Sequence, residues 1–187
     1  MLIPTSLLNM LLALGVILLQ FFSIGLLILF FRERTEGTIG TRIGNFLRRY
    51  GLFLAFLIVL AGTALSLYYS EVIGYPPCGL CWLQRVFLYP QVLLLAYAAW
   101  KRDYNIAPYI ILLSIFGGII ALYQHALQMG WILDVLPCPA APELADCAQR
   151  LVFEFGYITI PLMSFTSFAF VAVVMLFVRK RNIQPHA

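Results

Sequence analysis

The chain has 187 residues, of which 63% are apolar and 11% are charged, and its mean hydropathy is +0.94. Typical globular domains are roughly 45–50% apolar and about 25% charged, so this composition excludes a soluble domain, a disordered chain and a small secreted protein. The net charge of +4 does not indicate a nucleic-acid partner, because most Lys and Arg residues gather in three short clusters between long uncharged stretches.

The uncharged stretches have the length of membrane-spanning helices, which need about 20 apolar residues. In chain order they are Met1–Phe31, Tyr50–Ser70, Val86–Trp100, Tyr104–Leu133 and Phe155–Val178. Four are long enough as they stand, and Val86–Trp100 can span a bilayer only if its helix extends back past Arg85. No stretch alternates apolar and polar residues as the strands of a membrane barrel do. The sequence therefore predicts an all-α integral membrane protein with five spans.

The basic clusters follow the first, third and fifth stretches, and short basic loops face the cytoplasm. They are Arg32, Arg34, Arg42, Arg48 and Arg49; Lys101 and Arg102; and Arg179, Lys180 and Arg181. We therefore expect a basic cytoplasmic loop over 32–49 and a cytoplasmic tail over 179–187. The N-terminus and the segments Glu71–Leu83 and Met129–Glu154 then lie outside. The first stretch lacks a basic start and is longer than the apolar run of a signal peptide, so we expect a retained helix.

All four cysteines fall in the two predicted outer segments. Cys78 and Cys81 form the sequence Pro-Cys-Gly-Leu-Cys in the first segment, and Cys138 and Cys147 lie in the second. Disulfides persist on that side of a membrane. Four cysteines allow three pairings. Proximity in the chain favours Cys78–Cys81 with Cys138–Cys147, while the other two pairings would join the two loops.

Three kinds of chemistry are open to these cysteines. Two structural disulfides are one, and a zinc site is another. The oxidising compartment and the nine-residue offset between Cys138 and Cys147 count against zinc, so we expect no metal. A redox-active dithiol pair is the third, and it is favoured because strained or exposed disulfides, such as the small ring that CxxC closes, are the labile ones.

Arg85 strengthens the redox interpretation. It follows Cys81 by four residues, hence on the same face of a helix that begins near Cys81. The uncharged run behind it covers only about 22 Å at 1.5 Å per residue, less than the roughly 30 Å of a bilayer core. Arg85 is thus expected at the outer boundary beside a thiol, where a cation favours the thiolate and stabilises negative charge on an acceptor oxygen. The alternative is an arginine that only anchors the helix at the interface.

The second outer segment is predicted to have two parts. Pro137 and Pro139 flank Cys138 and prevent a helix, so Cys138 is expected on an extended, accessible strand. A helical spacing then follows, which predicts an amphipathic helix that carries Cys147 and lies either on the membrane or on the top of the helix bundle. The apolar positions of this predicted helix are Leu144, Ala148, Leu151, Val152 and Phe155.

Several segments together resemble the DsbB family of disulfide-bond formation proteins, especially its BdbC-like branch. The first is Pro77-Cys78-Gly79-Leu80-Cys81-Trp82-Leu83-Gln84-Arg85, followed by Tyr89-Pro90. The others are Tyr123-Gln124-His125 with Leu127-Gln128, and Phe155-Gly156-Tyr157-Ile158-Thr159-Ile160-Pro161. The resemblance covers roughly residues 50 to 178. It implies a four-helix membrane domain over 50–178, to which 1–31 adds an N-terminal transmembrane helix.

The resemblance implies a protein-disulfide:quinone oxidoreductase of the bacterial cytoplasmic (inner) membrane, with its cysteines on the extracytoplasmic face. Its partner would be a soluble thioredoxin-fold thiol oxidase of the DsbA type, and its cofactor a membrane quinone, ubiquinone or menaquinone. By loop order, Cys138 would form the mixed disulfide with the partner and Cys147 would be its mate. Cys78 would exchange with Cys147, and Cys81 would contact the quinone beside Arg85.

His125 matches a family position near the quinone, and its alternative is a buried, hydrogen-bonded histidine. Two other classes of function remain open. Vitamin K epoxide reductase-like proteins also combine a helical bundle, a CxxC and a quinone, but their outer-loop cysteine pair precedes the CxxC, whereas here it follows. A membrane scaffold with static disulfides would contain cysteines that exchange with nothing.

Overall fold

The computed structural model describes residues 5–35, 41–132 and 146–183, with side chains as far as 180. Within these ranges it contains five helices long and apolar enough to cross a membrane, which confirms the predicted number of spans. They are α1 (Thr5–Thr35), α2 (Arg42–Leu67), α3 (Gly79–Lys101), α4 (Ala107–Met129) and α5 (Ile160–Ile183). A short π-helix, η1 (Tyr68–Val72), continues α2, and a 3-10 turn, η2 (Tyr104–Ile106), precedes α4.

Local side-chain chemistry sets where several helices begin and end. The hydroxyl of Thr41 accepts a hydrogen bond from the Gly44 amide at 3.1 Å and caps α2. The Cys78 sulfur caps α3 by accepting from the Cys81 amide at 3.3 Å. Gly130 ends α4 in the left-handed region at φ 73°, a conformation that glycine adopts without steric cost. The start of α3 at Gly79 confirms that the third span extends back past Arg85.

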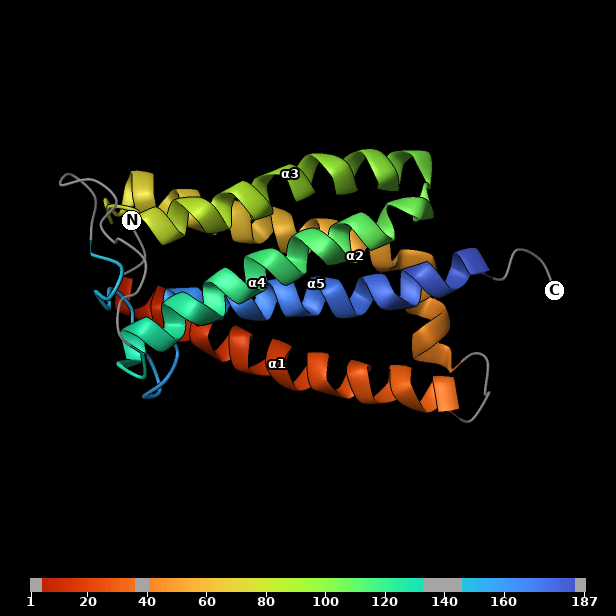
Figure 1. The fold of residues 1–187 in the computed structure, drawn as a ribbon, viewed down its shortest axis with the longest axis horizontal. Coiled ribbons are helices and arrows are strands. Elements are labelled where there is room, and N and C mark those ends of the chain that lie inside the picture. The colour runs from red at the N-terminus through yellow and green to blue at the C-terminus, as the bar shows by residue number, and fades with distance from the viewer. Residues whose placement is uncertain (1–4, 36–40, 133–145, 184–187) are drawn as a thin grey trace.

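Successive helices run in opposite directions along one long axis (Figure 1). The ends of α1, α3 and α5 therefore meet at one end of the bundle, where Arg32, Lys101 and Lys180 lie. Cys78 and Cys81, at the start of α3, lie at the opposite end. This separation of basic residues from cysteines is the one that the predicted topology requires.

α5 forms the centre of the bundle, since it packs against α1, α2 and α4. Its aromatic side chains Phe168, Phe170 and Phe177 are buried in the main apolar core. Glycines allow the neighbouring helices to approach closely, as small residues do in membrane bundles. A Cβ built on Gly117 of α4 would lie 2.4 Å from the Phe168 ring, and one on Gly51 of α2 would lie 2.6 Å from Val178.

The predicted amphipathic helix is wrong for the part that the structure describes. Residues 146–159 form turns and irregular backbone, and Leu144 lies outside the described residues. Glu154 and Ile158 bond to each other across a tight turn, in which Phe155 (φ 51°) and Gly156 (φ 78°) take positive φ angles that a helix excludes. The Asp146 carboxylate accepts from the Ala148 amide at 3.0 Å, a local bond that competes with helix formation. Because the positive φ angles of Phe155 and Gly156 exclude a helix there, the fifth helix begins at Ile160 rather than at Phe155.

α1 and α2 both extend into the predicted basic segment 32–49, where a buried acid joins them. Glu33 accepts from the Thr41 hydroxyl at 2.6 Å and from the Arg48 guanidinium at 2.7 Å. The Glu33 side chain is almost fully buried in this ion pair. The pair fixes the end of α1 against the first turns of α2.

Candidate functional site

The CxxC pair lies at the start of α3, and both cysteines are free thiols. Their sulfurs are 2.8 Å apart, a hydrogen-bonded contact longer than the roughly 2.05 Å of a disulfide. Cys78 is buried and Cys81 is partly buried. Because the N-terminus of a helix carries partial positive charge, this position favours a thiolate. The hydrogen bond to Cys81, and after it burial, raises the pKa of Cys78 above its ordinary value.

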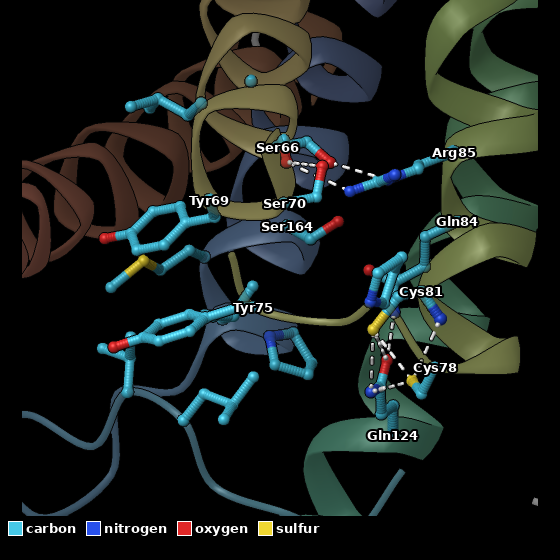
Figure 2. A pocket seen from close by; sticks show the side chains of 18 of the residues that line it. Ser66, Tyr69, Ser70, Tyr75, Cys78, Cys81, Gln84, Arg85, Gln124 and Ser164 are labelled. Atoms are coloured by element: carbon cyan, nitrogen blue, oxygen red, sulfur yellow. Dashed lines mark hydrogen bonds between the residues drawn. The ribbon is translucent and has the colours of Figure 1, made fainter. Parts of the chain in front are cut away.

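Two glutamines hold the thiol pair from the side. The Gln124 amide of α4 donates to the sulfur of Cys78 at 3.1 Å and to that of Cys81 at 3.4 Å (Figure 2). The Gln84 amide of α3 donates to the Gln124 oxygen at 2.6 Å, which fixes the direction of the Gln124 NH₂ group. The amide is therefore oriented to stabilise negative charge on either sulfur.

Arg85 lies one helical turn beyond Cys81 and is buried. Its Nε donates to the Ser66 hydroxyl and a terminal nitrogen donates to the Ser66 carbonyl, both at 3.0 Å. The guanidinium also lies 5.1 Å from the centre of the Trp82 ring. Arg85 is thus a buried side chain held between α2 and α3.

Cys81 and Arg85 line the same cavity, whose volume is about 200 Å3. Cys81, Gln84, Arg85 and Leu88 reach it from one face of α3, at the spacing of successive helical turns. The opposite side includes Tyr69 and Tyr75, whose rings stack 5.9 Å apart (Figure 2). The rest of the lining is largely apolar and comes from all five helices and from the segments before α3 and α5. It includes Leu12, Val16, Gly62, Leu65, Pro76, Pro77, Leu151, Val152, Ile160, Pro161 and Met163.

Cys147 is fully buried and disulfide-bonded. Since Cys78 and Cys81 are free thiols, this disulfide includes neither of them. Cys147 and Cys78 nevertheless belong to one buried cluster with Leu80 and Leu127, against which Cys81 also packs. The fold thus brings Cys147 and the CxxC pair into one apolar cluster. Cys138 lies outside the described residues.

Gln128 of α4 attaches the second outer segment to the bundle. Its side-chain amide donates to the carbonyls of Cys147 at 3.3 Å and Gln149 at 2.9 Å. The Arg150 guanidinium donates in turn to the Gln128 carbonyl. These bonds hold Cys147 at the end of α4 that also presents Gln124.

His125 lies away from this arrangement. It is buried, its Nδ1 is 2.8 Å from the Thr159 hydroxyl, and its ring meets Trp131 edge to face at 5.6 Å. His125 is not among the residues that line the cavity. The adjacent Gln124 faces the thiols instead.

Of the candidate residues inferred from the sequence, the structure brings together Cys78, Cys81, Cys147 and Arg85, and it separates His125 from them. Sequence reasoning did not identify Gln84, Gln124 or Ser66 as functional side chains. A signal for the glutamines was available, because polar residues within an apolar span generally face the bundle interior and serve a function. The signal for Ser66 was weaker, because its contact with Arg85 joins two helices.

Comparison with known proteins identifies the family. The family described as disulfide bond formation protein DsbB matches residues 48–178. The chain is 38% identical over 135 residues to "probable disulfide formation protein C 1" of Bacillus cereus, covering 72% of this chain and 96% of that protein. It is 38% identical over 136 residues to "probable disulfide formation protein" of Chlamydia trachomatis, with coverage of 72% and 96%.

A third relative is the "SPbeta prophage-derived disulfide bond formation protein B" of Bacillus subtilis. It is 40% identical over 118 residues, which are 63% of this chain and 78% of that protein. No solved structure matches the chain at a significant level. The matched region contains the CxxC pair, Arg85, Gln124 and Cys147, that is, the whole thiol site described above. The chain therefore belongs to the DsbB family of disulfide bond formation proteins.

Proposed function

We propose that this chain reoxidises an extracytoplasmic thioredoxin-fold thiol oxidase of the DsbA type and delivers the electrons to a membrane quinone. Membership of the DsbB family makes it a multi-pass membrane oxidoreductase that acts in disulfide-bond formation with a thiol oxidase partner. The proposal adds the chemical class of the acceptor, the fold of the partner, the roles of the cysteines and the side of the membrane. It places the protein in the bacterial cytoplasmic membrane with its cysteines on the outer face, which the distribution of basic residues supports.

The first step is exchange with the reduced partner. Cys147 is fully buried, so its sulfur is closed to a thiolate of another protein. We therefore assign the attacked sulfur to Cys138. The partner thiolate forms a mixed disulfide with Cys138 and releases Cys147 as a thiolate. The second partner thiol then attacks the mixed disulfide, so the partner leaves oxidised and this pair holds two electrons.

The second step is exchange between the two cysteine pairs. The Cys147 thiolate attacks Cys78 of a Cys78–Cys81 disulfide and releases Cys81 as a thiolate. The shared burial of Cys78 and Cys147 supports this direction of attack. Attack by Cys138 on the Cys147–Cys78 bond then restores the outer disulfide and leaves a Cys78–Cys81 dithiol. Free thiols at Cys78 and Cys81 together with a disulfide-bonded Cys147 are the redox state that this step produces.

The cavity beside Cys81 suits an aromatic acceptor. A cavity of about 150 Å3 can hold a benzene ring, and this one is larger, at about 200 Å3, with a mainly apolar lining. A bound quinone would supply an acceptor for two electrons and two protons. Cys81 would face it with its sulfur, and Gln124 would stabilise the thiolate form of that sulfur. Arg85 would hold an acceptor oxygen, since the guanidinium is fixed by Ser66 and needs no reorientation.

The observation that carries the proposal is that Cys81 and Arg85 line one apolar cavity within the membrane domain. The test combines the purified protein in detergent, an excess of a reduced DsbA-type partner, and a short-chain ubiquinone or menaquinone. We expect one quinone to be reduced for each disulfide formed in the partner, measured as the loss of quinone absorbance. If the partner is oxidised while the quinone absorbance stays constant, a quinone is not the electron acceptor. A partner that stays reduced would favour the alternative of a membrane scaffold whose cysteines exchange with nothing.

A further inference from the structure

α1 turns a series of polar side chains toward the bundle, although it is an apolar helix. Asn9, Gln20, Ser23 and Glu33 recur on the face that packs inward, whereas Leu11, Leu18 and Phe21 are exposed. Three of these side chains have hydrogen-bond partners outside α1, while Ser23 donates to the Leu19 carbonyl of α1 itself. Gln20 donates to Thr166 of α5 at 3.1 Å, and Glu33 pairs with Arg48 of α2 at 2.7 Å. Such bonds fix the rotation of a helix within a membrane, because polar groups facing lipid are costly.

The same face of α1 reaches the acceptor cavity. Leu12 and Val16, one helical turn apart, contribute to its lining together with residues of α2 and α5. Just before them, Asn9 accepts a hydrogen bond from the Tyr69 hydroxyl at 2.6 Å. Tyr69 itself lines the cavity, and in Figure 2 the ribbon of α1 passes beside Tyr69 on the side away from the cysteines.

α1 lies outside the region that matches the DsbB family, which begins at residue 48. It packs chiefly along α5. The lipid-facing side of α1 is well exposed, with Leu18 70% and Phe21 71% accessible, so the cavity and the surrounding hydrocarbon lie on opposite faces of this helix.

We propose that α1 is the lateral wall of the acceptor site and that Leu12 and Val16 determine which apolar molecules reach Cys81 from the lipid. This inference rests on the proposed function and assigns to the additional helix a part in acceptor selection. α1 is held near both ends, where Asn9 accepts from the Tyr69 hydroxyl and Glu33 pairs with Arg48. A smaller side chain at position 12 or 16 enlarges the cavity toward α1, and a larger one fills it.

Side-chain replacement tests the wall without removing the helix. One variant is Leu12→Ala with Val16→Ala, and the other is Leu12→Trp. The matched control is Leu11→Trp, which places the same bulk on the adjacent, exposed position of α1. The first readout is the rate at which N-ethylmaleimide, a small membrane-soluble reagent, alkylates Cys81, measured by mass spectrometry of the protein with its CxxC pair reduced. This readout requires no quinone.

We expect alkylation of Cys81 to become several-fold faster in the double alanine variant and several-fold slower in Leu12→Trp, with Leu11→Trp like the native chain. The second readout is the KM for two short-chain quinones that differ in the size of their ring substituents. The KM for the larger quinone, relative to that for the smaller one, should fall in the alanine variant and rise in Leu12→Trp.

The two readouts test separately whether α1 is a wall of the cavity and whether a quinone is the electron acceptor. Alkylation rates that change as expected, while no variant reduces a quinone, would support the wall and refute the quinone function. Unchanged alkylation in both Leu12 variants would refute the wall, whatever the quinone kinetics. Equal effects of Leu11→Trp and Leu12→Trp would also refute it, because they would reveal a general disturbance of α1.

Discussion

Arg85 is a buried cation of α3 whose guanidinium is fixed by hydrogen bonds to α2. Two hydrogen bonds to Ser66 fix the guanidinium at the wall of the cavity that Cys81 also lines. A preorganised cation in a medium of low dielectric stabilises both the attacking thiolate and the negative charge on an acceptor oxygen. We expect Arg85 to act on the acceptor reaction and not on the exchange with the partner.

Replacement of Arg85 by Ala should therefore slow quinone reduction about a hundred- to a thousandfold, which corresponds to about 2.7–4 kcal/mol. Arg85→Lys should recover part of the rate, because charge returns without the planar fork that bonds Ser66 twice. Quinone absorbance under saturating reduced partner measures the first reaction, and a single-turnover exchange assay measures the second. Unchanged quinone kinetics in Arg85→Ala would show that Arg85 only anchors the helix at the membrane interface.

Gln124 is the donor that contacts both sulfurs of the CxxC pair. A hydrogen bond to a charged group contributes about 1.5–3 kcal/mol, so Gln124→Leu should slow alkylation of Cys81 at constant pH by about ten- to a hundredfold. The control is Gln91→Leu, since Gln91 is equally buried but bonds to the Phe87 carbonyl and the Ser114 hydroxyl. Equal rates for both variants would contradict the assigned role of Gln124.

At the scale of elements, the apolar stretches predicted all five helices, because length and hydrophobicity are properties of single segments. The sequence also predicted that Cys81 and Arg85 share a helical face, since both belong to α3. The irregular segment 146–159 could not be predicted from its helical spacing. Its backbone is held by Gln128 of α4 and by the turn at Phe155 and Gly156, and these contacts override the local pattern.

The residues missed in the site have the same explanation. Gln124 meets the thiols, and Ser66 meets Arg85, only because α2, α3 and α4 pack together. Likewise, Leu12 and Val16 appeared to be ordinary members of an apolar span until packing placed them at the cavity. The sequence identified the candidate groups Cys78, Cys81 and Arg85, and the packing of helices determined their neighbours.

The contact between α4 and α5 gives a test of the packing. A Cβ on Gly117 would lie 2.4 Å from the Phe168 ring, whereas one on the adjacent Gly118 would be at an ordinary distance of 3.7 Å. Gly117→Ala should therefore destabilise the protein by about 1–3 kcal/mol through overpacking. Gly118→Ala should leave stability unchanged or raise it, because alanine favours a helix over glycine. Unfolding in detergent mixtures measures both, and equal midpoints would contradict the α4–α5 packing.

At the scale of the whole molecule, the two ends of the bundle have different chemistry. Basic residues lie at one end and the cysteines at the other, so the cysteines are expected outside the cell membrane. After reduction of intact cells, a membrane-impermeant thiol reagent applied outside should label Cys138 and the partly buried Cys81, and should label Cys78 and Cys147 more slowly because both are buried. Labelling of Cys78 and Cys81 only after the inner face has been opened would contradict a five-span protein with its N-terminus outside.

In the proposed order of transfer, electrons enter at the outer cysteine pair and are then held by Cys78 and Cys81. The most direct measurement mixes the fully oxidised, quinone-free protein with one equivalent of reduced partner, quenches with acid, alkylates and locates the free thiols by mass spectrometry. This order of transfer predicts an oxidised partner, alkylated Cys78 and Cys81, and a Cys147 that is again disulfide-bonded. Alkylation at Cys138 and Cys147, with Cys78 and Cys81 still joined, would contradict it.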